Sequence, residues 1–167
     1  MTTSEQLDLS DKSTMQFSYG QFLAYDQNES EPGSLWTDKH ISQGFVRRSE
    51  SLGIGTLVQF GAANVRTFSG TPASIEAYDR VISVPINLPS GILCIEGPEE
   101  YPIQRSINVE PGAYRLVAAQ SVVSETELSI DIFLEALAET TANSEILKAD
   151  AGIEISGPLL ETGDVAP

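Results

Sequence analysis

The sequence predicts an all-β protein: an antiparallel β-sandwich with one short helix and an acidic C-terminal extension. Three observations carry this prediction. Short segments of alternating polar and apolar residues recur along the chain, and clusters of Gly, Pro, Asn and Ser separate them. The chain has 167 residues, 41% of them hydrophobic, which suffices for one domain with a real core. We expect a loose arm over residues 1–13, a β-sandwich over 14–139 and the acidic extension over 140–167.

Four elements are expected in the first part of the chain. Alternation over residues 15–25 predicts one long strand. Residues 28–34 contain Asn, Pro, Gly and Ser and have the composition of a loop. Thr37 is placed to cap a short helix and Gly44 to end it. Residues 55–68 then predict a second strand.

The middle of the chain predicts further short strands. Residues 77–88 alternate, but Pro85 cannot donate a ladder hydrogen bond, which favours an edge or bulged strand there. Residues 91–96 predict a short strand after a turn. Residues 105–109 and 113–123 are joined by a Pro-Gly turn, and we expect these two segments to form a hairpin.

The last clear strand is predicted over residues 127–136, with a helix beginning at Phe133 as the alternative. Beyond residue 140 the chain is rich in turn residues, and residues 152–155 are a possible added strand. Side chains alternate across a strand, so this one should have a core face and a solvent face. The core face would take Leu128, Ile130, Ile132, Leu134 and Ala136, and the solvent face Glu127, Ser129, Asp131, Phe133 and Glu135.

Charge is the most pronounced compositional feature. Twenty-four acidic residues against nine basic ones give a net charge of −15, and residues 121–167 alone hold ten acidic residues and one basic residue, a net −9. Such a chain is repelled by nucleic acid and anionic lipid and attracted to basic surfaces. Acidity that serves solubility alone is the alternative. We therefore expect no direct binding to nucleic acid and none to membranes.

The residues that catalysis or zinc binding would need are scarce. His40 is the single histidine and Cys94 the single cysteine, so neither a Ser-His-Asp set, a Cys-His pair nor a zinc site is expected. We predict that the chain is not an enzyme and needs no cofactor, while calcium bound by loop carboxylates stays open. A lone cysteine and a start without a signal-peptide pattern favour the cytoplasm.

Carboxylates are the better candidates for function. Alternate residues of a strand lie roughly 7 Å apart on one face, a spacing comparable to that of phosphates along a nucleic-acid backbone. An acidic row of this kind could bind a basic cleft, although a merely solvated strand face is the alternative. An aromatic side chain within the row would suit an interface anchor. The row comprises Glu125, Glu127, Asp131, Phe133 and Glu135, and a second acidic site in a loop comprises Glu96, Glu99 and Glu100.

Several short segments also follow one another in a fixed order. They are FSYGQF at residues 17–22, WTD at 36–38 followed by GF at 44–45, YDRVISVP at 78–85, GILCIE at 91–96 and PGAYRL at 111–116. Together they resemble the competence protein J family, whose characterised member inhibits a DNA-entry nuclease. The resemblance covers roughly residues 14–138 and implies a small cytoplasmic protein that binds and blocks such a nuclease. It carries over no inhibitory residue.

The expected function is therefore inhibition of a competence-associated nuclease, with carboxylates and an aromatic anchor occupying its basic DNA-binding cleft. Two alternatives remain open. A non-enzymatic ligand-binding sandwich for carbohydrate, lipid or calcium would show a deep pocket lined by aromatic residues. An assembly subunit would use an exposed sheet edge or a self-complementary apolar patch. The sequence does not specify the oligomeric state.

Overall fold

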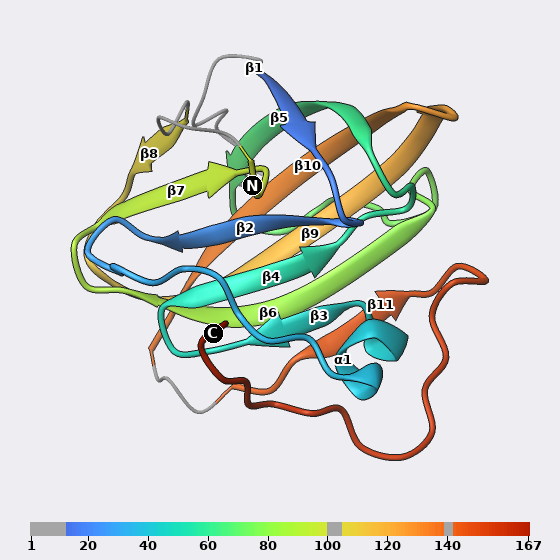
Figure 1. The fold of residues 1–167 in the computed structure, drawn as a ribbon. Helices are drawn as coiled ribbons and strands as arrows, with labels where there is room; N and C mark the ends of the chain where they lie inside the picture. The colour runs from blue at the N-terminus through green and yellow to red at the C-terminus, as the bar shows by residue number, and fades with distance from the viewer. Residues whose placement is uncertain (1–12, 100–104, 139–141) are drawn as a thin grey trace.

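The computed structural model describes residues 13–99, 105–138 and 142–167. Over these ranges the chain forms eleven strands and one helix, arranged as two β-sheets packed face to face (Figure 1). The predicted all-β class with one short helix is confirmed. Within the same ranges, no helix has the length and apolar character that crossing a membrane requires.

The larger sheet has six strands in the order β1-β5-β10-β9-β6-β11 and the smaller has five in the order β3-β4-β2-β7-β8. All pairings in the smaller sheet are antiparallel, whereas β5 and β10 pair in parallel in the larger one. The strands of the larger sheet are β1 (Ser13–Phe17), β5 (Gly61–Ser69), β6 (Arg80–Leu88), β9 (Gly112–Ser124), β10 (Glu127–Leu137) and β11 (Glu145–Lys148). Those of the smaller sheet are β2 (Gln21–Asp26), β3 (Phe45–Arg47), β4 (Ser51–Gly55), β7 (Ile92–Glu96) and β8 (Ser106–Asn108), and the helix is α1 (Asp38–Gln43).

The core lies between the two sheets. Strand β10 gives it Leu128, Ile130, Ile132 and Leu134, none more than 3% exposed, and the opposite sheet gives it Phe22, Phe45, Ile54 and Leu93. The predicted core face of the last strand is confirmed for these four residues, whereas Ala136, near the end of β10, is exposed. The alternative of a helix from Phe133 is wrong, because the strand continues to Leu137.

Local signals placed the helix correctly. The side chain of Thr37 accepts a hydrogen bond from the backbone N–H of His40, and Gly44 ends the helix in the left-handed conformation at φ 88°. The long strand expected over residues 15–25 is instead two strands, β1 and β2, separated by a turn at residues 18–20. Strands β3 and β4, over residues 45–55, were not expected except for the last residue of β4.

The hairpin expected across the Pro-Gly turn is wrong. Strand β8 pairs with β7 in the smaller sheet, whereas β9 pairs with β6 and β10 in the larger one, so this turn connects the two sheets. The expected edge or bulged strand at residues 77–88 is wrong, because β6 lies between β9 and β11 and its register with β9 is regular. Pro85 is tolerated there because it lies beyond residues 81–83, the part of β6 that β11 covers.

The acidic extension contributes to the fold. Its strand is β11, paired with β6, and not residues 152–155. The segment then passes α1 and runs along β3 (dark red in Figure 1). Leu160 exchanges two hydrogen bonds with the side chain of Gln43, at 2.8 and 2.9 Å, and Ile153 packs into the core. Backbone and side-chain contacts therefore hold this segment against the sandwich.

Candidate interaction surface

Asp131, expected in solvent on the outer face of β10, is buried instead. Its carboxylate accepts two hydrogen bonds from Arg66, both at 2.9 Å, and one from the Tyr78 hydroxyl at 2.7 Å. The side chain is 3% exposed. Three donors and burial leave this carboxylate little capacity to meet a partner in the present conformation.

Phe133 is buried as well, at 3% exposure. Its ring stacks on Phe68 with the centroids 5.2 Å apart, in a second small cluster on the outer face of the larger sheet. Ile75 and Tyr78, from the connection between β5 and β6, pack on this cluster. The expectation of a solvent-facing row is therefore wrong for Asp131 and Phe133, because a connecting loop covers that part of the sheet.

Tyr78 gives this covered cluster a measurable pH dependence. Burial, the hydrogen bond to Asp131 and the charge of that carboxylate raise the pKa of Tyr78 to about 12. Between about pH 10 and pH 12 the unfolded chain ionises this phenol while the folded chain keeps it protonated, so its contribution to stability falls as the pH rises. We expect Tyr78→Phe to cost about 1 kcal/mol at neutral pH and to lose less stability than the wild type on going from about pH 9 to pH 11. Urea denaturation at the two pH values measures this, and equal losses in both proteins would contradict it.

The remaining predicted acidic residues have different environments. Glu135 is partly exposed, 3.8 Å from Arg115. Glu96 accepts a hydrogen bond from the Tyr25 hydroxyl at 2.8 Å, and burial followed by this bond and charge raises the pKa of Tyr25. Glu99 is exposed near the end of β7, and Glu100 lies outside the described residues. The structure thus separates the loop site from the strand row.

Glu125 and Glu127 are both exposed, at the turn that joins β9 to β10. No ion pair involves either of them within the described ranges. Strand β6 begins at Arg80, opposite Gln120, so β9 residues 121–124 continue past the β6 ladder. The turn therefore projects from one end of the sandwich, at the upper right of Figure 1.

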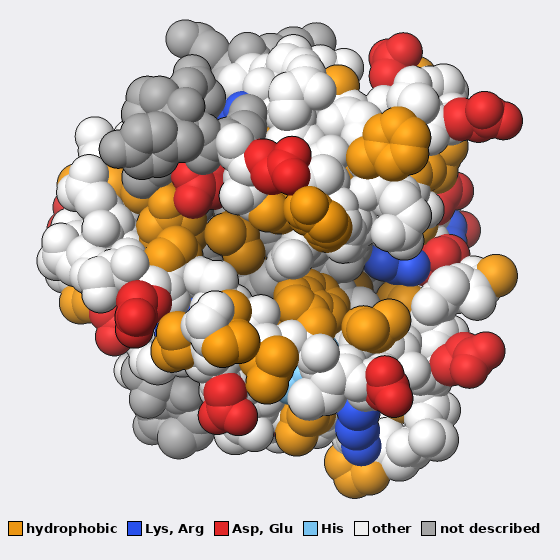
Figure 2. All heavy atoms as spheres, viewed as in Figure 1, with side chains coloured by type: hydrophobic (Ala, Val, Ile, Leu, Met, Phe, Trp, Pro, Cys, Tyr) orange, Lys and Arg blue, Asp and Glu red, His pale blue; other side chains and the backbone are white. Residues whose placement is uncertain are grey.

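Large apolar side chains gather at the same end. Phe60 is 64% exposed and Val123 60%, and Tyr19 is the most exposed at 74%. The backbone connects them, since Gly20 N–H donates to the Gln59 carbonyl at 2.8 Å and Ala62 N–H to the Thr126 carbonyl at 2.9 Å. Figure 2 shows hydrophobic side chains exposed over the centre and right of this view, with carboxylates around them. We use the name hairpin-end patch for the exposed residues at this end of the sandwich, which are Tyr19, Phe60, Val122, Val123, Glu125 and Glu127.

Tyr19 is held in a conformation unusual for its type. Its φ is 57°, and it is the one non-glycine residue with positive φ among the described residues. Left-handed backbone at a bulky residue costs about 1–3 kcal/mol, and such strain clusters at functional sites. Tyr19 also borders a cleft of about 440 Å³, whose lining includes Trp36, Ile41, Arg80 and Asp150. The fold thus presents this ring at the mouth of a cleft.

Most of the arginines form ion pairs with carboxylates of the same chain. Five arginines each lie within ion-pair distance of a carboxylate, in the pairs Arg47–Glu161, Arg48–Glu29, Arg66–Asp131, Arg80–Asp150 and Arg115–Glu135. The segments that build the hairpin-end patch, residues 13–21, 57–64 and 119–129, contain no Lys or Arg. The patch is therefore apolar at its centre and acidic at its margin.

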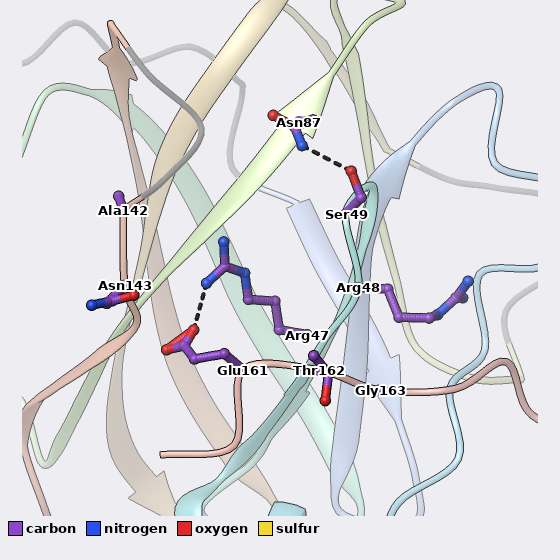
Figure 3. A pocket seen from close by; sticks show the side chains of 9 residues that line it. All are labelled: Arg47, Arg48, Ser49, Asn87, Ala142, Asn143, Glu161, Thr162 and Gly163. Carbon is purple, nitrogen blue, oxygen red and sulfur yellow. Dashed lines mark hydrogen bonds and ion pairs between the residues drawn. The ribbon is translucent and has the colours of Figure 1, made fainter. Parts of the chain in front are cut away.

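A second cavity, of about 550 Å³, opens at the other end of the molecule (Figure 3). Arg47 points toward Glu161, with which it forms an ion pair, and Asn87 donates a hydrogen bond to Ser49 at 2.8 Å. Neighbouring Arg48 donates to the Ser34 hydroxyl at 2.8 Å. None of the described residues that line this cavity is aromatic, and its charged groups already have partners, so it gives the ligand-binding alternative little support.

The two residues that catalysis might have used are structural. His40 is buried; its Nδ1 accepts from the Thr37 N–H at 3.1 Å and its Nε2 donates to the Thr162 carbonyl at 2.8 Å. Cys94 is a buried free thiol, and burial followed by the charges of Glu96 and Asp26 raises its pKa. Neither is poised as a base or a nucleophile. Across the described ranges, no three His, Cys, Asp or Glu side chains come together as a metal site would require.

Comparison with known proteins gives a consistent result. The family model for competence protein J matches residues 14–139. The crystal structure of ComJ from Bacillus subtilis, described as an inhibitor of the DNA-degrading activity of NucA, aligns with a TM-score of 0.67 and 16% identity over 80% of this chain and all of that one. The crocagin biosynthetic gene J product aligns with a TM-score of 0.48 and 18% identity over 74% of this chain and 98% of that one. A search of curated proteins gives no match.

Proposed function

The chain belongs to the competence protein J family, and from this membership we propose that it binds and inhibits a DNA-degrading nuclease. The match over residues 14–139, which includes β2 to β10 whole and β1 without its first residue, is the observation that carries the proposal. The membership also supports the expectation that the chain is not itself an enzyme. Its partner is then the active component, and this protein controls access to it.

The proposed mode of inhibition is occlusion of a basic DNA-binding cleft. A nuclease that grips phosphates needs a positive surface, and this protein carries a net charge of −15 with most of its arginines paired internally. Complementary charge raises the rate of encounter and opposes wrong partners more than it raises affinity. The proposed place of action is the cytoplasm, with which the buried free thiol of Cys94 is compatible.

A titration of a DNA-entry nuclease from the same organism with this protein tests the proposal. Digestion of linear DNA should stop at about one inhibitor per nuclease, and the association rate should fall at least about tenfold between about 0.05 M and 0.5 M salt. A basic nuclease of an unrelated family is the control for non-specific charge attraction. Continued digestion at stoichiometric excess, with no complex at low salt, would show that the proposed function is wrong.

A further inference from the structure

We propose that the hairpin-end patch is the surface that enters the basic groove of the nuclease, with Phe60 and Val123 as its apolar anchors. This inference rests on the proposed function and adds the part of the molecule that performs it. The patch replaces the acidic row predicted along β10 as the binding surface, because Asp131 and Phe133 of that row are buried beneath the connection between β5 and β6. Of that row, Glu125 and Glu127 belong to the patch.

The β9–β10 turn has the shape of a fixed projection. The β9–β10 turn, Glu125–Thr126, extends past the start of β6, and its flank is held at one point by the Val122 N–H, which donates to Asp79 at 2.9 Å. On the other flank, the Thr126 carbonyl accepts from the Ala62 N–H. These contacts fix a convex projection that a concave groove can receive without rearrangement, which lowers the entropic cost of binding.

The patch exposes large apolar side chains. Phe60 and Val123 are each at least 60% exposed. Phe60 immediately precedes β5 and Val123 lies near the end of β9, and these two strands flank the start of β10. Exposed apolar side chains that cluster, rather than lie scattered, mark interaction sites, and buried aromatic anchors dominate binding energies. A purely solvated acidic turn would need neither residue.

Charge identifies the kind of partner. The projection bears Glu125 and Glu127 and has Asp79 beside it. The stretches that form it, residues 57–64 and 119–129, contain no Lys or Arg. Arg66 of β5 and Arg80 at the start of β6 are each held by a carboxylate of this chain. An apolar tip with an acidic margin complements a basic groove around an apolar floor, and it repels an acidic or nucleic-acid surface.

Two variants and two matched controls test the inference with the same nuclease. Phe60→Ala removes an exposed ring, and we expect its Kd to rise about 30-fold or more. Glu125→Lys combined with Glu127→Lys should slow association about tenfold at low salt. Ile155→Ala and Glu145→Lys change an exposed apolar and an exposed acidic residue away from the patch, and should stay within about twofold of the wild type. Circular dichroism and thermal unfolding confirm that each variant is folded.

The outcomes separate the two proposals. If the wild type inhibits and both patch variants inhibit equally well, the surface assignment is wrong while the proposed function stands. The same conclusion follows if the controls lose as much affinity as the patch variants. If the wild type neither binds nor inhibits the nuclease, the proposed function fails, and the surface assignment fails with it. If only the patch variants lose affinity or association rate, the result supports both the proposed function and the surface assignment.

Discussion

Replacing Asp150 by Ala is expected to lower the free energy of unfolding by about 3 kcal/mol. Its partner Arg80 has a side chain only 7% exposed, with Nε 2.6 Å and one terminal nitrogen 3.1 Å from the carboxylate. Removing the carboxylate leaves a buried guanidinium without a counter-charge, which is costly. Breaking a buried ion pair typically costs about 3–5 kcal/mol. Because the side chain of Asp150 is about a quarter exposed, water can partly replace the carboxylate, so we expect a loss near the lower value. Urea denaturation at neutral pH measures the loss.

A second replacement shows whether the buried charge is the cause. In the Asp150→Ala background, Arg80→Met removes the guanidinium and should recover part of the lost stability. The Gly55 carbonyl, which also accepts from Arg80, keeps a partner because the Gln120 amide donates to it at 2.8 Å. If the double variant is less stable than Asp150→Ala, the explanation by an unpaired charge fails.

Acid provides an independent check on the same pair. Burial alone would raise the pKa of Asp150, but the hydrogen bonds from Arg80 and from Gly152 N–H, with the charge of Arg80, lower it overall. A carboxyl whose pKa is depressed on folding stabilises the protein above its unfolded pKa, near 3.9, and loses that contribution as the pH falls through the folded value. The stability gap between the wild type and Asp150→Ala should therefore narrow below about pH 4.

Local chemistry accounts for what the sequence predicted well. A cap at Thr37 and a stop at Gly44 define the helix, because both act within a few residues. The alternation over residues 127–136 predicted which side of β10 meets the core, since side chains of a strand alternate regardless of which strands flank it. Family resemblance and the family model agree on nearly the same residues, 14–138 and 14–139.

Non-local pairing explains what the sequence could not predict. Turn chemistry at Pro111–Gly112 indicates that the chain reverses there, but not that β8 and β9 join different sheets. Likewise, alternation places Asp131 and Phe133 on the outer face of β10, but only the fold shows that Ile75 and Tyr78 cover that face. Burial of a strand face depends on loops distant in sequence.

The candidate surface was predicted in part, for a similar reason. Charge identifies Glu125 and Glu127 from the sequence, whereas alternation predicts that Tyr19 and Phe60 lie inside strands. A signal for Phe60 does exist: the next residue is Gly61, and a glycine within a strand pattern often marks a break; in the structure β5 begins there, at a φ of 149°. A break at that glycine would have placed Phe60 in a loop, where an exposed aromatic residue indicates binding.

Gly61 is also where the second large effect is expected. A Cβ at this position would lie 2.1 Å from the Thr126 carbonyl oxygen, which is backbone and cannot swing aside. Gly61→Ala must therefore push β5 and the β9–β10 turn apart and weaken the hydrogen bond from Ala62 N–H to Thr126, 2.9 Å long in the wild type. The cost combines overpacking, about 1–3 kcal/mol, with the strain of positive φ at a residue with a side chain.

Gly112→Ala separates these two contributions. Gly112 has a φ of 155°, close to that of Gly61, but a Cβ there meets nothing within 4 Å. We expect Gly112→Ala to lose about 1–3 kcal/mol from backbone strain alone, and Gly61→Ala to lose about 2 kcal/mol more. Urea denaturation compares the losses, and faster exchange of the Ala62 amide proton should locate the damage in Gly61→Ala.

Since Ala62 pairs with Glu127 at the base of the projection, Gly61→Ala should also weaken inhibition of the nuclease, and Gly112→Ala should not. Equal losses of stability in the two variants would mean that the close approach of Gly61 to Thr126 does not hold the turn in place.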